Sequence, residues 1–527
     1  MIYGTADGLN GDRTSDDSLD ETEAEDARPR RKLTRRNFIK WSAAAGAAAG
    51  LGGMGFLSAS GIIKAPAEAS PAWEFYSTDP KTGQQVLRVD YSKVPDYTVP
   101  KPGVSPPGTL YVAQWFDYWP GSFTQDFETY IKQTFGYDVH VLVSIYESNE
   151  ELFEWITLGR QRFDVFFPSN YVVDLMKHGN LVYNLNTSWL PHFLTNVAVP
   201  GSQFVGVPPQ DSFDMNAWGE FVSEPYFWGT TGVGFNTDFI PRKDVEANGF
   251  DLLWMASWKP SNSPSTLNLV KHMRMLDDER DVLGWGFKKA GWEEQLSKGL
   301  TDSLGSPTGI PNDPNPPWNG VYQWTTNETD SNRVNDCGQW LVAARPNLFD
   351  YNSTEDAASL ASGASYLNQA WSGDIMYAKR PDQNSQLHVD YLIPKQGSTW
   401  WIDCAAIHSK SRNLWLAHQF LDFIHRIGDG DSDDPTNRWP ENQTLTRWNL
   451  YSTPNQRCYD YFWNLEHDAQ GNPTPIFPSG WIMTEEPILY PNKYDPAGFA
   501  RCDISGDVGL LNLENLYNPL WFALTSV

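Results

Sequence analysis

Three short apolar segments alternate with helical patterns over residues 109–178, and this alternation limits the possible folds more than any other feature. The segments are rich in Val, Leu, Phe and Tyr, which is typical of buried strands. The predicted strands are Leu110–Trp115, Asp138–Val143 and Phe163–Phe167, and the predicted helices are Ser122–Phe135, Glu150–Leu158 and Val172–His178. Such alternation predicts a parallel α/β sheet, in which ligands bind beyond the carboxyl ends of the strands.

The bulk composition narrows the class of protein. At 527 residues, with 40% hydrophobic and 14% aromatic content, the chain can bury two or three domain cores. A mean hydropathy of -0.48 and the absence of a second long apolar segment exclude a polytopic membrane protein. The net charge of -26 argues against nucleic acid as a partner, because phosphate binding needs clustered Lys and Arg. An acidic surface suits high salt, and it would also attract cationic small molecules.

Two arginines precede an Ala- and Gly-rich apolar segment near the N-terminus. The order is Thr34-Arg35-Arg36-Asn37-Phe38-Ile39-Lys40, an apolar segment from Ala43 to about Ile63, and then Ala67-Glu68-Ala69. This order resembles a twin-arginine (Tat) export signal, so we expect a periplasmic, cell-surface or extracellular protein. We interpret residues 1–69 as a disordered leader and signal peptide that is cut after Ala69. The alternative is a retained membrane anchor, since about 20 apolar residues can span a bilayer.

Two further segments are rich in residues that break regular structure. Prolines recur from Ser70 to Gly108, which predicts an extended tether over residues 70–108. Residues Ser303–Asp330 are rich in Pro, Gly, Asn and Asp, which predicts a surface insertion.

The four cysteines are Cys337, Cys404, Cys458 and Cys502, and none forms a Cys-x-x-Cys pair. The sequence therefore predicts no redox motif, no metal site and no cofactor. Outside the cytoplasm three disulfide connectivities are possible, and we expect the pair Cys458–Cys502. Cys404 lies in an apolar stretch, where a buried free thiol is an equally good interpretation.

Aromatic residues recur near the predicted strand ends, and several have a carboxylate beside them. The rings belong to Trp115, Tyr118, Tyr171, Trp371, Trp401 and Tyr451, and the carboxylates to Asp117, Asp374, Asp403 and the cluster Asp277, Asp278 and Asp281. Rings pack against methylenes and attract cations, and carboxylates accept N–H donors, so this combination suits an organic ammonium ligand. With 24 Trp and 23 Tyr, many rings must simply be core, and composition alone favours that interpretation.

The order of the motifs along the chain favours a binding site over a purely structural role for these rings. The series is Leu110–Trp115 with Tyr118-Trp119-Pro120, Tyr146-Glu147-Ser148-Asn149-Glu150, Asp164–Met176, Pro225–Asn236, Asp277–Val282, Phe349–Ser353 before Trp371-Ser372-Gly373, Trp401-Ile402-Asp403, and Tyr451–Asn455. From about Leu110 to Ile504 this series resembles the spermidine/putrescine-binding proteins of ABC transporters.

The resemblance implies a two-lobed α/β fold of the type II periplasmic-binding-protein class, with a ligand cleft between the lobes. Lobe 1 would comprise residues 109–226 and 402–456, and lobe 2 residues 227–401 and 457–527. Crossings that act as hinges would lie near Pro225–Trp228 and Trp401–Asp403. Such a protein would capture a polyamine, deliver it to an ABC permease and ATPase, act as a monomer and have no catalytic residues.

By matching position, the resemblance also implies a role for each site residue. Trp115, Tyr118, Tyr171, Trp371, Trp401 and Tyr451 would form an aromatic box around the methylenes. Asp278 and Asp281 would bind a terminal ammonium group, and Asp403 another amine of the ligand. Ser169 and Ser353 would offer polar contacts.

The sequence departs from the family pattern at a few of these positions. Phe116 stands where a hydroxyl or small polar residue is common, and Asp281 where a glutamate is usual. Ser505 is the nearest candidate for a C-terminal glutamine contact. Another amine or a betaine-like cation is therefore an alternative ligand.

Two alternatives from other functional classes are a Tat-exported enzyme and a surface adhesion or sensor domain. Against an enzyme, the sequence has no His-Glu-x-x-His, Gly-x-Ser-x-Gly or phosphate-loop motif.

Overall fold

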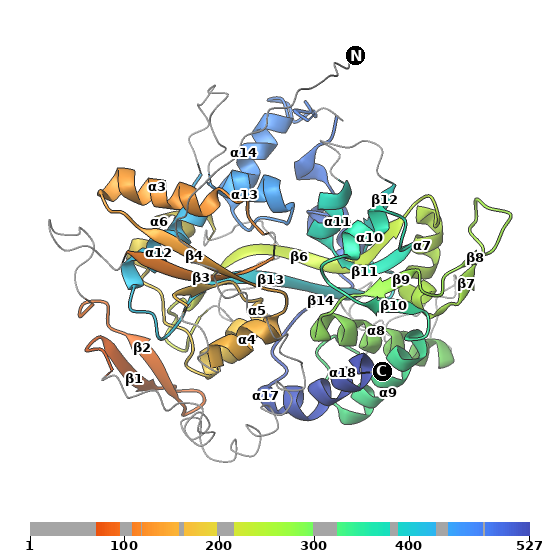
Figure 1. Ribbon diagram of the computed structural model, residues 1–527, viewed down its shortest axis with the longest axis horizontal. Coiled ribbons are helices and arrows are strands. Elements are labelled where there is room, and N and C mark those ends of the chain that lie inside the picture. The colour runs from red at the N-terminus through yellow and green to blue at the C-terminus, as the bar shows by residue number, and fades with distance from the viewer. Residues whose placement is uncertain are drawn as a thin grey trace, which may run out of the picture.

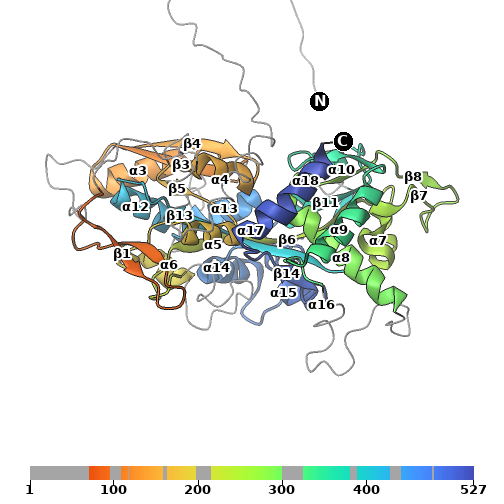
Figure 2. The ribbon, with the colours of Figure 1, turned by 90° about the horizontal axis from the view of Figure 1, so that it is seen from below.

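In the computed structural model, one mixed sheet extends through two lobes, with helices packed around it (Figures 1 and 2). The structure describes residues 70–94, 108–116, 118–157, 163–197, 215–298, 324–379, 388–427, 441–477 and 480–526. No helix within these ranges is long and apolar enough to cross a membrane.

Lobe 1 is built on three parallel strands, β3 (Thr109–Trp115), β4 (His140–Tyr146) and β5 (Val165–Phe166). Strand β3 lies between the other two, as the predicted β-α-β pattern requires. The helices of this lobe are α3 (Phe123–Phe135), α4 (Asn149–Thr157), α5 (Asn170–His178), the short η1 (Thr187–Trp189), α6 (Pro191–Asn196), α12 (Leu414–Ile424) and α13 (Glu441–Asn449). The predicted strands and helices of residues 109–178 are confirmed, with small shifts at their ends.

Two long antiparallel strands, β6 (Ser223–Asn236) and β13 (Ser398–Ile407), cross from one lobe to the other. Their register pairs Trp401 with Gly229 and Asp403 with Phe227, and a bulge follows Asp403. The two predicted crossing segments therefore lie side by side at the centre of the sheet. Every residue of β6 is buried, because the strand is covered on both faces.

Lobe 2 has parallel strands β9 (Met273–Met275), β10 (Leu348–Tyr351) and β11 (Leu367–Trp371), while β12 (Val389–Leu392) runs antiparallel to β6. The helices of this lobe are α7 (Arg242–Asn248), η2 (Gly249–Trp254), α8 (Glu279–Ser297), α9 (Ser331–Ala344), α10 (Asp356–Ala361) and α11 (Ser372–Lys379). A separate hairpin pairs β7 (Ser257–Trp258) with β8 (Leu267–Asn268).

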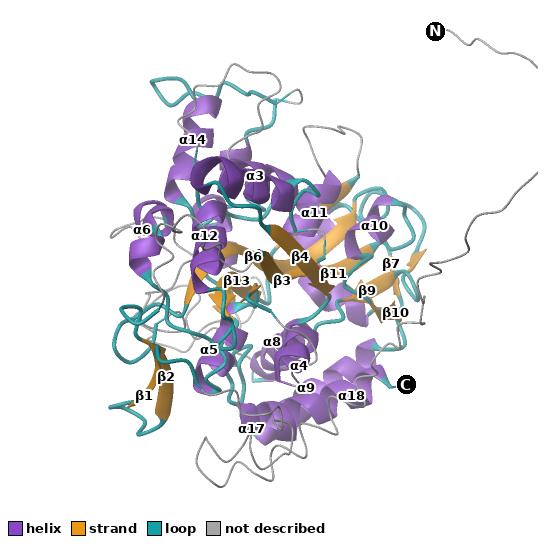
Figure 3. Cartoon of the chain, turned by 60° about the vertical axis from the view of Figure 1, so that its left-hand side comes forward, coloured by secondary structure: helices purple, strands orange, loops and turns teal. Residues whose placement is uncertain are grey.

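Eight strands of the ten-stranded sheet follow the order β10-β9-β11-β6-β13-β5-β3-β4, while β12 pairs with β6 and β14 with β13. Each lobe thus contributes parallel strands, and the two antiparallel crossing strands join them (Figure 3). This arrangement brings the carboxyl ends of β3 and β11, which belong to different lobes, toward the region between the lobes.

The C-terminal region joins two clusters of buried residues. Its elements are α14 (Gln456–Glu466), η3 (Met483–Glu485), α15 (Pro491–Tyr494), α16 (Pro496–Phe499), β14 (Cys502–Ile504), which pairs with β13, α17 (Leu510–Asn512), the π-helical turn η4 (Leu513–Tyr517) and α18 (Asn518–Thr525). Cys458 and Phe462 of α14 join a cluster of buried residues that draws on both lobes, whereas Tyr517 and Trp521 join a second cluster within lobe 2. The helix α14 packs toward α6, and the assignment of residues 457–527 to lobe 2 stays a prediction.

The predicted tether contains regular structure. Strands β1 (Glu74–Thr78) and β2 (Gln85–Val89) form an antiparallel hairpin, so the prediction of an extended tether is wrong for this stretch. The main-chain N–H of Leu87 donates to Asn180 Oδ1, and Arg88 pairs with Glu220. The hairpin is therefore docked on lobe 1 by hydrogen bonds that a count of prolines does not reveal.

The predicted disulfide is also wrong, because all four cysteines are free thiols. Cys458 Sγ lies on α14 beside Thr446 Oγ1, at 3.6 Å, whereas Cys502 is on β14. Cys404 is a buried free thiol, in agreement with the alternative interpretation. The signal segment, its cleavage site and most of the predicted insertion lie outside the described residues.

Candidate ligand-binding site

A cavity of about 520 Å³ lies between the two lobes. Its lining combines the carboxyl end of β3, the loop before α5, the start of α8, the turn from β11 into α11, and the middle of β13. All eleven predicted site residues line it: Trp115, Tyr118, Ser169, Tyr171, Asp278, Asp281, Ser353, Trp371, Trp401, Asp403 and Tyr451. Residues almost 340 positions apart in the sequence therefore meet in one place.

Asp403 is the buried carboxylate of the described cavity lining on the lobe 1 side, with only 3% of its surface exposed. Tyr118 Oη donates to its Oδ2 at 2.7 Å, and Ser169 Oγ donates to its Oδ1 at 2.8 Å. Burial raises the pKa of Asp403 to about 7, although these two hydrogen bonds oppose the rise. The side chain is therefore held in place as an acceptor, and a cation bound beside it would restore its charge.

Asp278 and Asp281 form a second acidic site at the start of α8. Asp278 caps the helix by accepting a hydrogen bond from the main-chain N–H of Asp281, at 2.9 Å. Burial raises the pKa of both carboxyls, and the pKa of Asp278 is raised further by Asp281. Two buried carboxylates this close favour a cationic ligand, because a cation removes both the desolvation penalty and the repulsion.

Neutral donors fix the position of Asp281. Thr231 Oγ1 donates to its Oδ1 at 2.8 Å, as does Thr399 Oγ1 at 2.5 Å, and Trp371 Nε1 donates to its Oδ2 at 2.7 Å. These three hydrogen bonds lower the pKa of Asp281 and oppose the effect of burial. Trp371 thus contributes both a ring to the cavity wall and a donor to the carboxylate behind it.

The rings form a continuous wall across both lobes. Trp115 of lobe 1 meets Trp371 of lobe 2 edge to face, with ring centroids 6.3 Å apart. The rings of Tyr118 and Tyr451 lie 5.3 Å apart, and Trp401 lies 5.4 Å from Tyr451. Such surfaces suit a chain of methylenes, and their faces attract cations.

Two glycines make room for this wall. A Cβ atom on Gly373 would lie 2.4 Å from Tyr451 Cδ1, and one on Gly229 would lie 2.9 Å from Trp401 Cζ2. Any larger residue at either position would displace the adjacent ring.

Sequence reasoning missed several lining residues. Asn149 donates from Nδ2 to both Ser169 Oγ and Tyr171 Oη at 3.0 Å, and so orients two predicted site residues. Asn149 lies within the motif Tyr146–Glu150, and this motif could have indicated its place at the site. Asp356 also lines the cavity, and the sequence did not indicate it. Asp374 lines the cavity too, although the sequence indicated it only as a carboxylate near an aromatic residue.

The structure also places the other residues that the sequence indicated for this site. Ser353 lines the cavity, and its Oγ accepts a hydrogen bond from the main-chain N–H of Asp277 at 2.8 Å. Ser505 lines the cavity as well, and Phe116 stands at it with 62% of its surface exposed. Arg280 is the one cationic side chain in the described lining, and its guanidinium packs on the Tyr171 ring.

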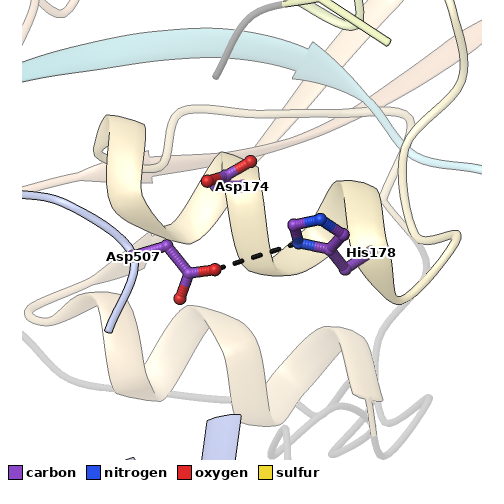
Figure 4. Close-up of side chains that lie close together, drawn as sticks. All are labelled: Asp174, His178 and Asp507. Carbon is purple, nitrogen blue, oxygen red and sulfur yellow. Dashed lines mark ion pairs between the residues drawn. The ribbon is translucent and has the colours of Figure 1, made fainter. Parts of the chain in front are cut away.

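A separate cluster of Asp174, His178 and Asp507 has the residue types of a metal site (Figure 4). Asp174 and His178 lie on α5, and Asp507 lies in the chain after β14. However, the ammonium group of Lys177 lies 2.6 Å from Asp174, and His178 Nδ1 is 3.8 Å from Asp507. The charge of Asp174 is therefore already balanced within the protein.

Comparison with known proteins identifies both the leader and the folded region. The model of the twin-arginine translocation pathway signal sequence matches residues 32–52, which confirms the predicted export signal. The spermidine/putrescine-binding periplasmic protein of Escherichia coli is 26% identical over 319 residues, which cover 60% of this chain and 73% of the relative. The putrescine/cadaverine-binding protein of Pseudomonas aeruginosa is also 26% identical, over 60% of this chain and 74% of its own.

The chain is a relative of the spermidine/putrescine-binding periplasmic proteins. The predicted resemblance is thereby confirmed, and these relatives are binding proteins rather than enzymes. Among solved structures, the TpPotD lipoprotein of Treponema pallidum has a TM-score of 0.53 at 19% identity, covering 80% of this chain and all of its own. The spermidine/putrescine ABC transporter substrate-binding protein of Streptococcus pneumoniae has a TM-score of 0.51 at 19% identity, over 79% of this chain and 98% of its own. These likenesses confirm the two-lobed periplasmic-binding-protein fold.

Proposed function

We propose that this protein is the extracytoplasmic substrate-binding protein of an ABC transporter, and that it captures a polyamine for uptake. The observation that carries the proposal is the enclosed carboxylate of Asp403, fixed by Tyr118 and Ser169 within a wall of aromatic rings. The names of the curated relatives support the same ligand class.

The chemistry of the cavity favours amines that carry N–H groups. Carboxylate oxygens at Asp403, Asp278 and Asp281 are acceptors for ammonium donors, and the rings between them suit methylenes. A betaine-like cation would satisfy the rings, but its methylated nitrogen has no N–H to donate to the buried carboxylates. The geometry therefore favours a polyamine over a quaternary ammonium compound.

We assign a proposed role to each of the eleven residues. The six rings would enclose the methylenes, Asp278 and Asp281 would bind one ammonium group, and Asp403 another. Ser169 would act by orienting Asp403, because its hydroxyl already donates to that carboxylate. Ser353 would offer a polar contact at the lobe 2 wall. The protein would act as a monomer and deliver its ligand to a permease and ATPase, without catalysing a reaction.

Isothermal titration calorimetry on the mature protein with putrescine, spermidine, agmatine and glycine betaine tests this proposal. We expect at least one polyamine to bind with a one-to-one stoichiometry and glycine betaine to bind more weakly. Failure of every polyamine to bind would contradict the proposal. Tight binding of glycine betaine alone would instead assign the cleft to quaternary ammonium ligands.

A further inference from the structure

The chain that follows β14 lies against both lobes at the edge of the cavity, and we call its residues 504–507 the strap. Strand β14 pairs with β13 from Ser398 to Trp400, and the main-chain N–H of Ser505 donates to the Trp400 carbonyl at 2.9 Å. Ser505 also lines the cavity. Because the strap lies beside a strand that crosses between the lobes, its contacts with each lobe affect how the lobes can separate.

Asn327 and Arg280 attach the strap to lobe 2. Asn327 Nδ2 donates to the Ile504 carbonyl at 2.8 Å, and Asn327 Oδ1 accepts from the main-chain N–H of Gly506 at 2.8 Å. Arg280, on α8, donates from Nη2 to the Gly506 carbonyl at 2.9 Å and to Asn327 Oδ1 at 2.7 Å. These hydrogen bonds make the strap move with lobe 2.

Asn170, the first residue of α5, joins the strap to lobe 1. Its Nδ2 donates to the Ser505 carbonyl at 2.5 Å, and its Oδ1 accepts from the main-chain N–H of Ile402 at 3.2 Å. Asn170 and Ser505 are each only 3% exposed, so breaking this hydrogen bond leaves two buried polar groups without partners. One side-chain amide therefore holds both the strap and the crossing strand β13.

Other contacts between α5 and the opposite side support this junction. The Arg280 guanidinium lies over the Tyr171 ring, 4.8 Å from its centroid. At the other end of α5, His178 Nδ1 lies 3.8 Å from Asp507 Oδ2 (Figure 4). The His178 side chain is 49% exposed, so solvent screens this pair. Asn170 supplies the buried and directional contact of the group.

We propose that Asn170 is a positioning residue that clamps the two lobes together through the strap and so slows the release of ligand. The kinetic consequence rests on the proposed function, because release requires a bound ligand. When the lobes separate about the crossing strands, Ile402 stays near the pivot whereas Ser505 moves with lobe 2. The hydrogen bond from Asn170 to Ser505 must therefore break for the cleft to open. Asn170 is not among the described lining residues, so it acts on the ligand through the strap.

Stopped-flow kinetics with spermidine and putrescine on matched variants test the clamp. At pH 8, Asn170→Asp keeps an acceptor for the Ile402 N–H but loses the donor to Ser505. The dissociation rate constant should therefore rise about threefold to tenfold, and the association rate constant should change by less than about twofold. Asn327→Ala detaches the strap from lobe 2 and should give the same pattern.

The double variant Asn170→Asp with Asn327→Ala tests whether the two side chains act through the same strap. The strap connects the lobes in series, so breaking both attachments should raise the dissociation rate about as much as breaking one. Effects that multiply would show that the two side chains act independently, and they would contradict the clamp. Asn515→Asp is the control and should keep the wild-type rate, because Asn515 is exposed and its side chain donates to the nearby Leu511 carbonyl.

Small-angle X-ray scattering of the ligand-free proteins separates this inference from the proposed function. The radius of gyration should be larger in Asn170→Asp and in Asn327→Ala than in wild type. If wild type binds an amine and both variants keep its dissociation rate, the clamp is wrong while the proposed function stands. If wild type binds neither amine, the proposed function fails, and unchanged dimensions in both variants would then overturn the clamp as well. A lower midpoint of thermal unfolding with an unchanged dissociation rate would assign Asn170 a purely structural role and also overturn the clamp.

Discussion

The two walls of the cavity differ in what they offer a ligand. Lobe 1 presents rings and hydroxyls, with Asp403 as its one buried carboxylate among the described lining residues. Lobe 2 presents four carboxylates, at Asp278, Asp281, Asp356 and Asp374. Either wall alone would leave a cation partly hydrated, whereas the two walls together replace its water with rings and acceptors. Both walls therefore offer rings, whereas lobe 2 supplies most of the carboxylates and lobe 1 contributes Asp403 alone among the buried carboxylates of the described lining.

The largest expected effect concerns Asp403, the buried carboxylate of the lobe 1 wall. Asp403→Asn removes its charge but keeps its shape, so polyamine affinity should fall by about two orders of magnitude or more. Asp460→Asn, an exposed position on α14 away from the cavity, is the matched control. Calorimetry measures both variants, and an unchanged affinity in Asp403→Asn would show that charge recognition lies elsewhere.

A smaller effect is expected for Trp371, which lies on the lobe 2 wall and faces Trp115 of the lobe 1 wall. Trp371→Ala removes a ring that faces Trp115 and a donor to Asp281, so affinity should fall about tenfold or more. Trp371→Phe keeps a ring but lacks the N–H, and it should lose less. Equal losses in the two variants, measured by calorimetry, would assign the effect to the hydrogen bond instead of the ring.

Ligand binding should also depend on pH. Because burial raises the pKa of Asp403 to about 7, the empty site is protonated below that pH, and binding a cation must release the proton. Affinity should therefore fall about tenfold from pH 8 to pH 6 through this group alone. Titrations in buffers of different ionisation enthalpy measure the released proton, and Asp403→Asn should release less. A wild-type affinity that stays constant over this range would contradict the raised pKa.

The raised pKa of Asp403 also determines how the stability of the empty protein changes with pH. The folded pKa of Asp403 lies above the unfolded value of about 3.9, so the folded state binds more protons between these two values. The contribution of Asp403 to the stability of the empty protein is therefore lost as pH rises from about 4 to about 7. Thermal unfolding without ligand should show this loss in wild type, and Asp403→Asn should remove it.

The smallest effect is expected from the two tyrosine hydroxyls. Tyr118→Phe removes a donor to Asp403, and Tyr451→Phe removes a donor to Asp374. Each change should weaken binding only a few-fold, because a ligand ammonium can replace the lost donor and a net hydrogen bond contributes about 1 kcal/mol. Tyr118→Phe should also move the midpoint of the pH profile upward. The same upward shift in Tyr451→Phe would show that the two carboxylates do not respond separately.

The sequence predicted the site better than it predicted the periphery. Ten of the eleven residues lie at or just after a strand end, at a helix start or on a crossing strand, whereas Tyr451 follows the end of α13. The order of these motifs is visible along the chain. The place of Asp356 in the cavity wall was not predictable, because it depends on how α10 and α11 approach each other. The docking of β1 and β2 depends on side chains such as Asn180 and Glu220, which are far away in the sequence.

The cysteine prediction failed for a related physical reason. Proximity in the C-terminal segment indicated a Cys458–Cys502 pair, but Cys458 on α14 lies beside Thr446, whereas Cys502 lies on β14, which pairs with β13. Apolar faces decide where such segments pack, and their partners are set by the tertiary fold.

Small-angle X-ray scattering of the mature protein, with and without its tightest-binding polyamine, tests the central claim most directly. If the ring-bearing and acidic walls close on the ligand through the crossing strands β6 and β13, the radius of gyration should decrease at saturation. Asp403→Asn should need a much higher ligand concentration for the same change. Unchanged dimensions at saturating ligand would contradict the account.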